Sequence, residues 1–295
     1  MMRRDGWRRL GAWLLALLLG LGGLAWGEEA PAYRYEKTGD GMTYDSPTLR
    51  CSIEVGQLDG TKVYVSRIWM EDPGRQILKA GSPWHKKLAE AEELAKQLPR
   101  AALVVNGSGY VSPLYPDIPE NYPGTSADYY YTPLGSLAVT NGELLRNLEG
   151  VPFCGLTLEA DGLHMYRGAD NEEVLARNPT QTWCFYEQCP LIGNGVSILN
   201  RDWDFAKRKA IRTVIAKVDD HNYVVLTATS VHGLTLMSCT DFLLGEFSPE
   251  WAYNLDGGPS SALLRRRYGK KGHHLVYGGR QKIVDVMGFA ELPDE

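Results

Sequence analysis

A short stretch near the C-terminal end, residues 251–261 (WAYNLDGGPSS), places an amide, a carboxylate and two hydroxyls around a pair of glycines. Residues two apart on an extended strand point to the same face. Asn254 and Asp256 therefore project together, while Leu255 faces the opposite side and the core. The stretch presents an amide and a carboxylate on one polar face, directly before a turn.

The residues after Asp256 describe a turn that can bind an anion. Gly257 and Gly258 have no Cβ atom, so they can adopt positive φ and bring main-chain N–H groups close to a ligand. Consecutive N–H groups in such a turn form an anion-binding concavity, and Ser260 and Ser261 add hydroxyl donors. The alternative is a tight turn that only ends a strand, in which Asp256 caps N–H groups. The residue types alone leave both interpretations open.

Together with four other segments, this turn resembles the signature of a known family. The segments are, in chain order, LVVNGSGY (103–110), LAVTNGEL (137–144), Arg212-Thr213, GLTL (233–236) and NLDGGPSS (254–261). None of them is specific alone, but the five in this order resemble the phosphodiester glycosidase family. The resemblance extends from about residue 63 to residue 292.

The resemblance implies hydrolysis of a sugar-1-phosphodiester of the N-acetylglucosamine type, giving free sugar and a phosphomonoester. Ordinary glycosidases use one carboxylic acid to protonate a poor leaving group and a second carboxylate to activate water or attack. A phosphomonoester already leaves readily, so the acid is less necessary. The site needs cationic or N–H contacts to the departing phosphate and a carboxylate near the anomeric carbon.

On this resemblance, Asp256 and Arg212 are the predicted catalytic residues. Asp256 would act as nucleophile, base or stabiliser of the oxocarbenium ion, and Arg212 would face the phosphate. The predicted substrate-binding residues are Asn106, Gly107, Thr213, Asn254, Gly257, Gly258, Ser260, Ser261 and Arg280. For either arginine the alternative is a solvated surface side chain. No metal or cofactor is expected, and the fold must gather Asn106, Arg212 and Asp256 into one pocket.

The sequence departs from the family pattern in several places. Pro259 stands where a third glycine is usual and removes one N–H from the expected cradle. An Asp-Gly-Arg step is missing after residues 227–229, and Ala216 replaces a usual glycine. His232 lies near the missing step, where it is either a substitute or a bystander. These departures keep two alternatives open: a non-catalytic module that binds envelope glycans or phosphoglycans, and a hydrolase that releases a phosphorylated sugar.

The N-terminal residues indicate export. Two arginine pairs precede an apolar run over residues 10–25 that ends in small residues, which is typical of a signal peptide over residues 1–27. An uncleaved anchor is the alternative, and it would be the only expected attachment to a membrane. We expect a secreted, periplasmic or cell-envelope protein, with an N-terminal arm over residues 28–49 and one domain over residues 50–295.

The net charge argues against a nucleic-acid partner, and the cysteine spacing argues against a zinc site. The formal net charge of -5 leaves no basic footprint, so nucleic acid is not an expected partner. In an exported protein the five cysteines allow up to two disulfides with one thiol left over, or buried free thiols. Their spacing does not resemble a zinc site. The histidine pair 273–274 and the aspartate pair 219–220 are most simply a loop and a hairpin tip.

The elements that must position these residues are mostly strands. Alternating apolar residues predict strands over 50–55 and 62–69, and turn residues predict hairpins over 137–145, 155–167 and 213–229. Helical spacing predicts helices over 82–98, with Ser82 as N-cap, and over 235–244. The apolar run 101–105 predicts a buried strand that ends at Asn106. A tyrosine-rich loop over 107–132 would either stack on a sugar ring or pack on itself. We predict a single α+β domain, with a β-rich mixed sheet and flanking helices.

Overall fold

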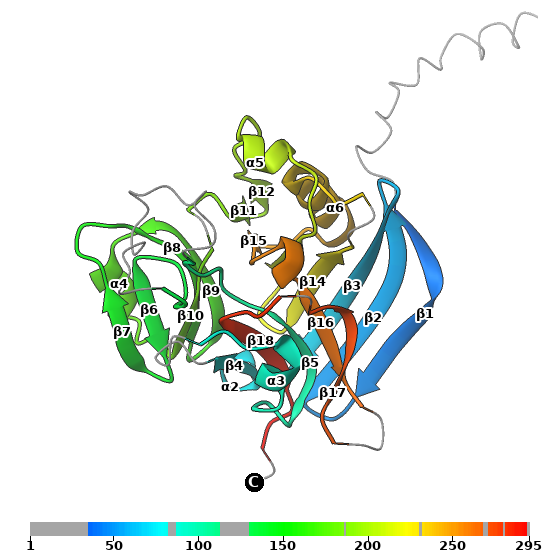
Figure 1. Ribbon diagram of the computed structural model, residues 1–295, viewed down its shortest axis with the longest axis horizontal. Coiled ribbons are helices and arrows are strands. Elements are labelled where there is room, and N and C mark those ends of the chain that lie inside the picture. Colours follow the sequence, from blue (N-terminus) through cyan, green and yellow to red (C-terminus); the bar gives the residue numbers. More distant parts are fainter. Residues whose placement is uncertain are drawn as a thin grey trace, which may run out of the picture. The chain divides into compact units, whose positions relative to one another are not determined.

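The strands of the protein form three antiparallel sheets (Figure 1). The computed structural model describes residues 35–81, 87–112, 130–185, 187–229, 232–267, 271–279 and 281–293. Residues 33–295 form one compact unit. The predicted α+β, β-rich class is confirmed. A mixed sheet was expected, but the strand pairs in all three sheets are antiparallel. Many neighbouring strands are consecutive in sequence and joined by short turns, and such hairpins pair antiparallel.

The largest sheet has eight strands. In spatial order these are β1 (Tyr35–Asp45), β2 (Leu49–Leu58), β3 (Thr61–Met70), β14 (Asn222–Ala228), β13 (Thr213–Lys217), β15 (Trp251–Asn254), β11 (Pro190–Gly193) and β12 (Val196–Ser197). The predicted hairpin of β13 and β14 is confirmed, and the Asp219 carboxylate at its tip accepts the N–H groups of His221 and Asn222, each at 2.9 Å. Part of the expected N-terminal arm forms β1, which pairs with β2.

The second sheet has the order β7 (Glu143–Asn147), β6 (Leu137–Thr140), β10 (Gln181–Trp183), β8 (Phe153–Glu159) and β9 (Gly162–Ala169). It contains the two other predicted hairpins, β6–β7 and β8–β9. The third sheet has the order β17 (His273–Gly278), β16 (Ala262–Arg266), β5 (Ala101–Asn106), β18 (Asp285–Ala290) and β4 (Ile77–Gly81). The predicted strand 101–105 is thus the central strand of the third sheet.

Short helices cover the sheets, and one longer helix follows the loop after β14. They are α2 (Pro73–Gln76), α3 (Ala91–Ala95), α4 (Asn171–Leu175), α5 (Asp204–Lys207), α6 (Leu236–Phe247) and the 3-10 helix η3 (Gly258–Ser260). The predicted helix 235–244 is confirmed as α6, whose N-cap Thr235 accepts the N–H of Ser238 at 2.9 Å. The other predicted helix is observed only as α3, and residues 82–86 with its expected N-cap lie outside the described residues.

The apolar core has several parts, and β5 belongs to two of them. Leu103 and Val105 pack in the main core with β18 and β16 residues, while Ala101 and Val104 pack against α3 residues such as Leu94. All six residues of β5 are buried, as expected for a strand covered on both faces. The strand therefore holds Asn106 at a fixed point inside the molecule. Within the described parts of the chain, no helix is both long and apolar enough to cross a membrane.

Candidate active site

The turn that carries Asp256 lies against the end of β5. The Asp256 N–H donates to the carbonyl of Gly107 at 3.1 Å, and the Asn106 side-chain amide donates to the carbonyl of Asp256 at 2.8 Å. Both main-chain groups of Asp256 are thus held by two consecutive residues that are about 150 positions away in sequence. These hydrogen bonds hold the end of β5 and the Asp256 turn next to each other.

Asn106 is the centre of a buried polar network beneath the turn. Its side-chain oxygen accepts the Thr213 hydroxyl at 2.8 Å and the N–H of Ala262 at 3.0 Å. The hydroxyl oxygens of Thr213 and Ser261 are 3.1 Å apart. Asn106, Thr213 and Ser261 are each at most 1% exposed, and none of them lines a described cavity at the turn. The structure therefore places these three predicted substrate-binding residues as supports of the turn.

Asn254 is also buried inside the protein. Its amide donates to the carbonyl of Leu255 at 2.8 Å and lies 3.7 Å from the sulfur of Cys189. Its side-chain oxygen has no hydrogen-bond partner among the described residues. Asn254 is fully buried and does not line the cavity at the turn, whereas Asp256 does.

The cavity beside Asp256 has a volume of about 280 Å³. It brings together the two predicted catalytic residues, Asp256 and Arg212, from the turn after β15 and the residue before β13. Its lining includes apolar and aromatic side chains as well as charged and polar ones: Tyr110, Leu134, Phe185, Phe205, Arg208, Ala210, Arg212, Asp256, Gly257, Gly258, Pro259, Ser260 and Gln281. Such a mixed lining is typical of a small-molecule site.

Asp256 is only 9% exposed, and burial is the largest influence on the pKa of its carboxyl. Burial raises the pKa of Asp256 to about 7 because a charged carboxylate loses its solvation. The Ser260 hydroxyl and the Gly257 N–H, 2.7 Å away, lower the pKa, and the charge of Asp285 raises it. Near neutral pH, Asp256 is therefore poised between a carboxylate and a carboxylic acid, as general acid–base catalysis requires.

Arg212 is a buried cation that faces the same cavity. One of its terminal nitrogens donates to the carbonyls of Phe205, at 2.9 Å, and Arg208, at 2.8 Å, and its guanidinium lies 4.3 Å from the centre of the Phe205 ring. Burial lowers the pKa of Arg212, but an arginine stays charged in proteins. Within the described part of the chain no carboxylate pairs with it. A fixed, desolvated positive charge without a protein counter-ion is suited to an anionic ligand.

Arg208 is a cavity residue that the sequence analysis did not assign. It is exposed, and its guanidinium lies 5.2 Å from the centre of the Phe205 ring. Phe205 thus stacks with two arginines and also contacts Phe185, with ring centres 6.1 Å apart. The signal in the sequence was the basic stretch 207–209, only a few residues before Arg212. Only α5 and the turn after it bring these side chains together.

The glycine turn is less available to an anion than its sequence suggests. The N–H of Gly257 is bound to Asp256, and the N–H of Gly258 donates to the carbonyl of Ile211 at 3.0 Å. Gly258 has the expected positive φ, +60°, whereas the backbone of Gly257 is extended. Gly257 is required for another reason: an added Cβ would lie 2.8 Å from the Ile211 carbonyl oxygen. Ser260 and Pro259 both line the cavity.

Two other predicted features fall partly outside the described residues. Arg280 itself is not described, while its neighbour Gln281 lines the cavity. Of the tyrosine-rich loop, residues 113–129 are not described. Tyr110 lines the cavity, and its hydroxyl lies 3.2 Å from the carbonyl of Lys282, at the start of the turn before β18.

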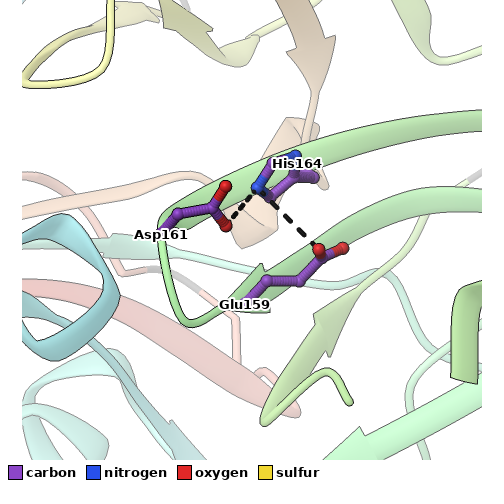
Figure 2. A group of neighbouring side chains, drawn as sticks. All are labelled: Glu159, Asp161 and His164. Carbon is purple, nitrogen blue, oxygen red and sulfur yellow. Dashed lines mark hydrogen bonds and ion pairs between the residues drawn. The ribbon is translucent and has the colours of Figure 1, made fainter. Parts of the chain in front are cut away.

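One group of possible metal ligands occurs among the described residues, at the β8–β9 hairpin (Figure 2). Figure 2 shows His164 between Asp161 and Glu159, with its Nε2 atom 2.8 Å from Asp161 and 3.9 Å from Glu159. The Glu159 carboxylate already binds Arg177 at 2.9 Å, Tyr166 at 2.6 Å and Thr157 at 2.8 Å. These three residues do not line the Asp256 cavity, and the Glu159 carboxylate is already engaged by protein donors.

Comparisons with known proteins agree with this architecture. The catalytic domain of zebrafish N-acetylglucosamine-1-phosphodiester alpha-N-acetylglucosaminidase, auto-inhibited by its pro-peptide, is similar with a TM-score of 0.61 and 18% identity, over 87% of this chain and 88% of that one. A hypothetical protein from Synechocystis is similar with a TM-score of 0.50 and 12% identity, over 88% of this chain and 72% of that one.

At these identities the solved structures show a shared fold alone. No curated protein sequence matches the chain. A family model described as phosphodiester glycosidase matches residues 99–289, which is more than half of the chain and spans both β5 and the Asp256 turn. The chain belongs to the phosphodiester glycosidase family.

Proposed function

We propose that the protein is an exported hydrolase that cleaves a sugar-1-phosphodiester of the N-acetylglucosamine type. The observation that carries this proposal is that one cavity is lined both by a carboxyl whose pKa is about 7 and by a buried arginine that has no carboxylate partner among the described residues. The family membership and the activity that the name of the zebrafish relative gives support the same reaction class.

The reaction breaks the bond between the anomeric carbon and its oxygen. Water supplies a hydroxyl to the anomeric carbon, and the phosphomonoester departs with the bridging oxygen. Arg212, assisted by Arg208 at the mouth of the cavity, binds the phosphate and stabilises the charge that develops on it. Asp256, as a carboxylate, supports the anomeric centre as nucleophile, base or electrostatic partner. Phe205 and Phe185 offer apolar surface to the ring.

The first test is an assay of the mature chain with an N-acetylglucosamine-1-phosphodiester, in which free sugar and sugar phosphate are measured separately. We expect free sugar. Asp256→Asn and Arg212→Lys should each lower kcat/KM by roughly 10²–10³-fold, because the first removes the carboxylate charge and the second replaces the planar, forked guanidinium by a point charge that cannot make the same contacts to phosphate. Asp220→Asn and Arg201→Lys are matched controls on the surface, with side chains 82% and 49% exposed.

Unchanged activity in both site variants would reject these assignments. Release of a phosphorylated sugar would instead indicate a phosphate-ester hydrolase that cleaves on the other side of the oxygen. The control variants should retain wild-type kinetics, which separates the loss of these two groups from the cavity from a general effect of the same substitutions at the surface.

A binding module without turnover is the second candidate. It is favoured by the Asp256 turn, whose Gly257 and Gly258 N–H groups are used within the protein and whose third cradle position is Pro259. Saturable binding of sugar phosphates without product, abolished by Arg212→Lys, would support this candidate. Its expected partner is a glycan or phosphoglycan of the cell envelope.

A further inference from the structure

A buried ion pair lies behind the site, between the last two strands of the third sheet. Lys79 on β4 and Asp285 on β18 are 3.1 Å apart, with side chains 2% and 0% exposed. Lys79 is the register partner of Met287, so Asp285, two residues earlier, lies diagonally across on the same sheet face. Lys79 also donates to the carbonyl of Thr182 at 2.6 Å. A buried pair of this kind is costly to desolvate, so its presence is not explained by stability alone.

Asp285 holds the corner of the chain that follows Asn106. Its carboxylate accepts the N–H of Ser108 at 2.6 Å, and its carbonyl accepts the N–H of Gly107 at 3.1 Å. The contact leaves no room for a side chain, because a Cβ on Gly107 would lie 2.1 Å from the Asp285 carboxylate and 2.7 Å from Trp183. Gly107, a predicted substrate-binding residue, is therefore a glycine because Asp285 packs on it.

This corner is the one that carries Asp256. Gly107 accepts the Asp256 N–H, and Asn106 donates to the Asp256 carbonyl. A continuous series of contacts thus joins Lys79 to Asp285, Asp285 to the corner at residues 106–108, and the corner to Asp256. No solvent-exposed group takes part in the series.

We propose that Lys79 and Asp285 are a positioning pair for the reaction: they fix the corner that holds both main-chain groups of Asp256, and Asp285 adds a negative charge to the surroundings of the Asp256 carboxyl. Neither side chain lines the cavity, so neither touches substrate. The inference rests on the proposed function, in which Asp256 acts as a carboxylate.

The electrostatic part of the pair acts through the protonation of Asp256. The Asp285 charge raises the pKa of Asp256, in addition to the larger effect of burial. The other charged or titratable groups that face the cavity in the described residues are Arg208 and Arg212, before β13, and Tyr110, after β5. If the charge of Asp285 is removed, the pKa of Asp256 should fall, and the carboxylate should persist to lower pH.

The test compares the acid limb of kcat/KM against pH in three proteins: wild type, Asp285→Asn and the double variant Lys79→Met with Asp285→Asn. An asparagine still accepts the Ser108 N–H, and the double variant leaves no unpaired buried charge, so it should keep the fold. We expect the acid limb to move down by about 0.5–1 pH unit in Asp285→Asn, because a like charge near a carboxyl raises its pKa. It should move in the same direction, but by less, in the double variant, which also removes the positive charge of Lys79. Lys79→Arg keeps the charge and should keep the limb near its wild-type position.

Lys96→Met and Asp220→Asn are matched controls, since their side chains are 66% and 82% exposed. They should leave the limb unchanged. An acid limb that stays within about 0.2 pH unit of wild type in both pair variants, with only stability or kcat lowered, would overturn the proposal and leave the pair a structural feature.

A second readout does not depend on turnover. The carboxyl carbon signal that is lost in Asp256→Asn reports the titration of Asp256 directly by NMR, in the full mature chain. A downward shift is expected in the two pair variants, and it should be smaller in the double variant. If the shift is seen but no sugar phosphodiester is cleaved, the proposed function fails while the coupling of the pair to Asp256 stands. If cleavage occurs but no shift is seen, the positioning pair is wrong and the function stands.

Discussion

At the scale of single residues, the protein keeps a carboxyl where its charge is unfavourable. Asp256 sits at the wall of a small cavity, and its hydrogen bonds from Ser260 and Gly257 offset only part of the loss of water. Catalytic sites commonly hold such perturbed groups at a cost to stability. The same reasoning applies to Arg212, which is buried without a carboxylate among the described residues.

The raised pKa of Asp256 predicts a pH-dependent cost. An unfolded aspartate has a pKa of about 4, so between about pH 4 and pH 7 the folded state binds more protons than the unfolded state. Its stability should therefore fall as pH rises through this window. Relative to Asp256→Asn, which cannot ionise, the wild type should lose about 2–3 kcal/mol of unfolding free energy between pH 5 and pH 8.

Urea unfolding of both proteins at the two pH values measures this difference. Asp220→Asn, at an exposed hairpin tip, provides the comparison for a change of charge alone. A wild-type protein that keeps the same stability relative to Asp256→Asn at pH 5 and pH 8 would show that Asp256 ionises normally.

At the scale of elements, the site depends on the end of β5. A strand buried on both faces places Asn106 where three separate segments need a polar partner: the Asp256 turn, the start of β13 and the start of β16. Because these segments are far apart in sequence, the side chain of one residue fixes their relative positions. The network explains why Asn106, although it resembles a ligand-binding residue of the family, is only 1% exposed.

Asn106→Ala should cost about 2–5 kcal/mol of stability, since it leaves the Asp256 carbonyl and the Ala262 N–H buried without partners. It should also lower kcat more than it raises KM, because the turn that carries Asp256 loses its support. Denaturant unfolding and steady-state kinetics measure the two effects, with the exposed Asn200→Ala as control. A raised KM with normal stability would return Asn106 to a direct role in sugar binding.

At the scale of the whole molecule, the fold is held by packing between sheets without cross-links. Residues of all three sheets share the main core; Cys51, Cys184, Cys189 and Cys239 are buried without a disulfide, and Cys154 is half-buried. Burial raises the pKa of Cys51, Cys184 and Cys239 to about 12, which suppresses their thiolates. Of the two alternatives that the sequence allowed, the structure has the free thiols.

A reductant should therefore leave the Tm unchanged, because a lost disulfide would have cost about 2–4 kcal/mol. A thiol reagent should react first at Cys154 in the native protein and with the other four cysteines only after unfolding. Thermal unfolding with and without reductant, together with thiol titration of Cys154→Ser, checks this expectation. A clear fall in Tm on reduction would mean that an exported form carries a disulfide.

The sequence by itself determined the three hairpins, the buried strand that ends at Asn106 and the family. Local signals are sufficient for these features: turn residues such as those at the tip of β13–β14 specify a hairpin, helical spacing with the Thr235 cap specifies α6, and the ordered motifs specify the phosphodiester glycosidase family.

Only the tertiary structure decided which polar residues line the cavity and which are buried beneath the turn. Asn106, Asn254, Thr213 and Ser261 have the residue types of a binding site, yet the packing of β5, β13 and β16 around the turn buries them. The Lys79–Asp285 pair gave no local signal of a role, since its two members come from different strands. Exposure and charge pairing arise from contacts between distant segments, and no short stretch of sequence encodes them.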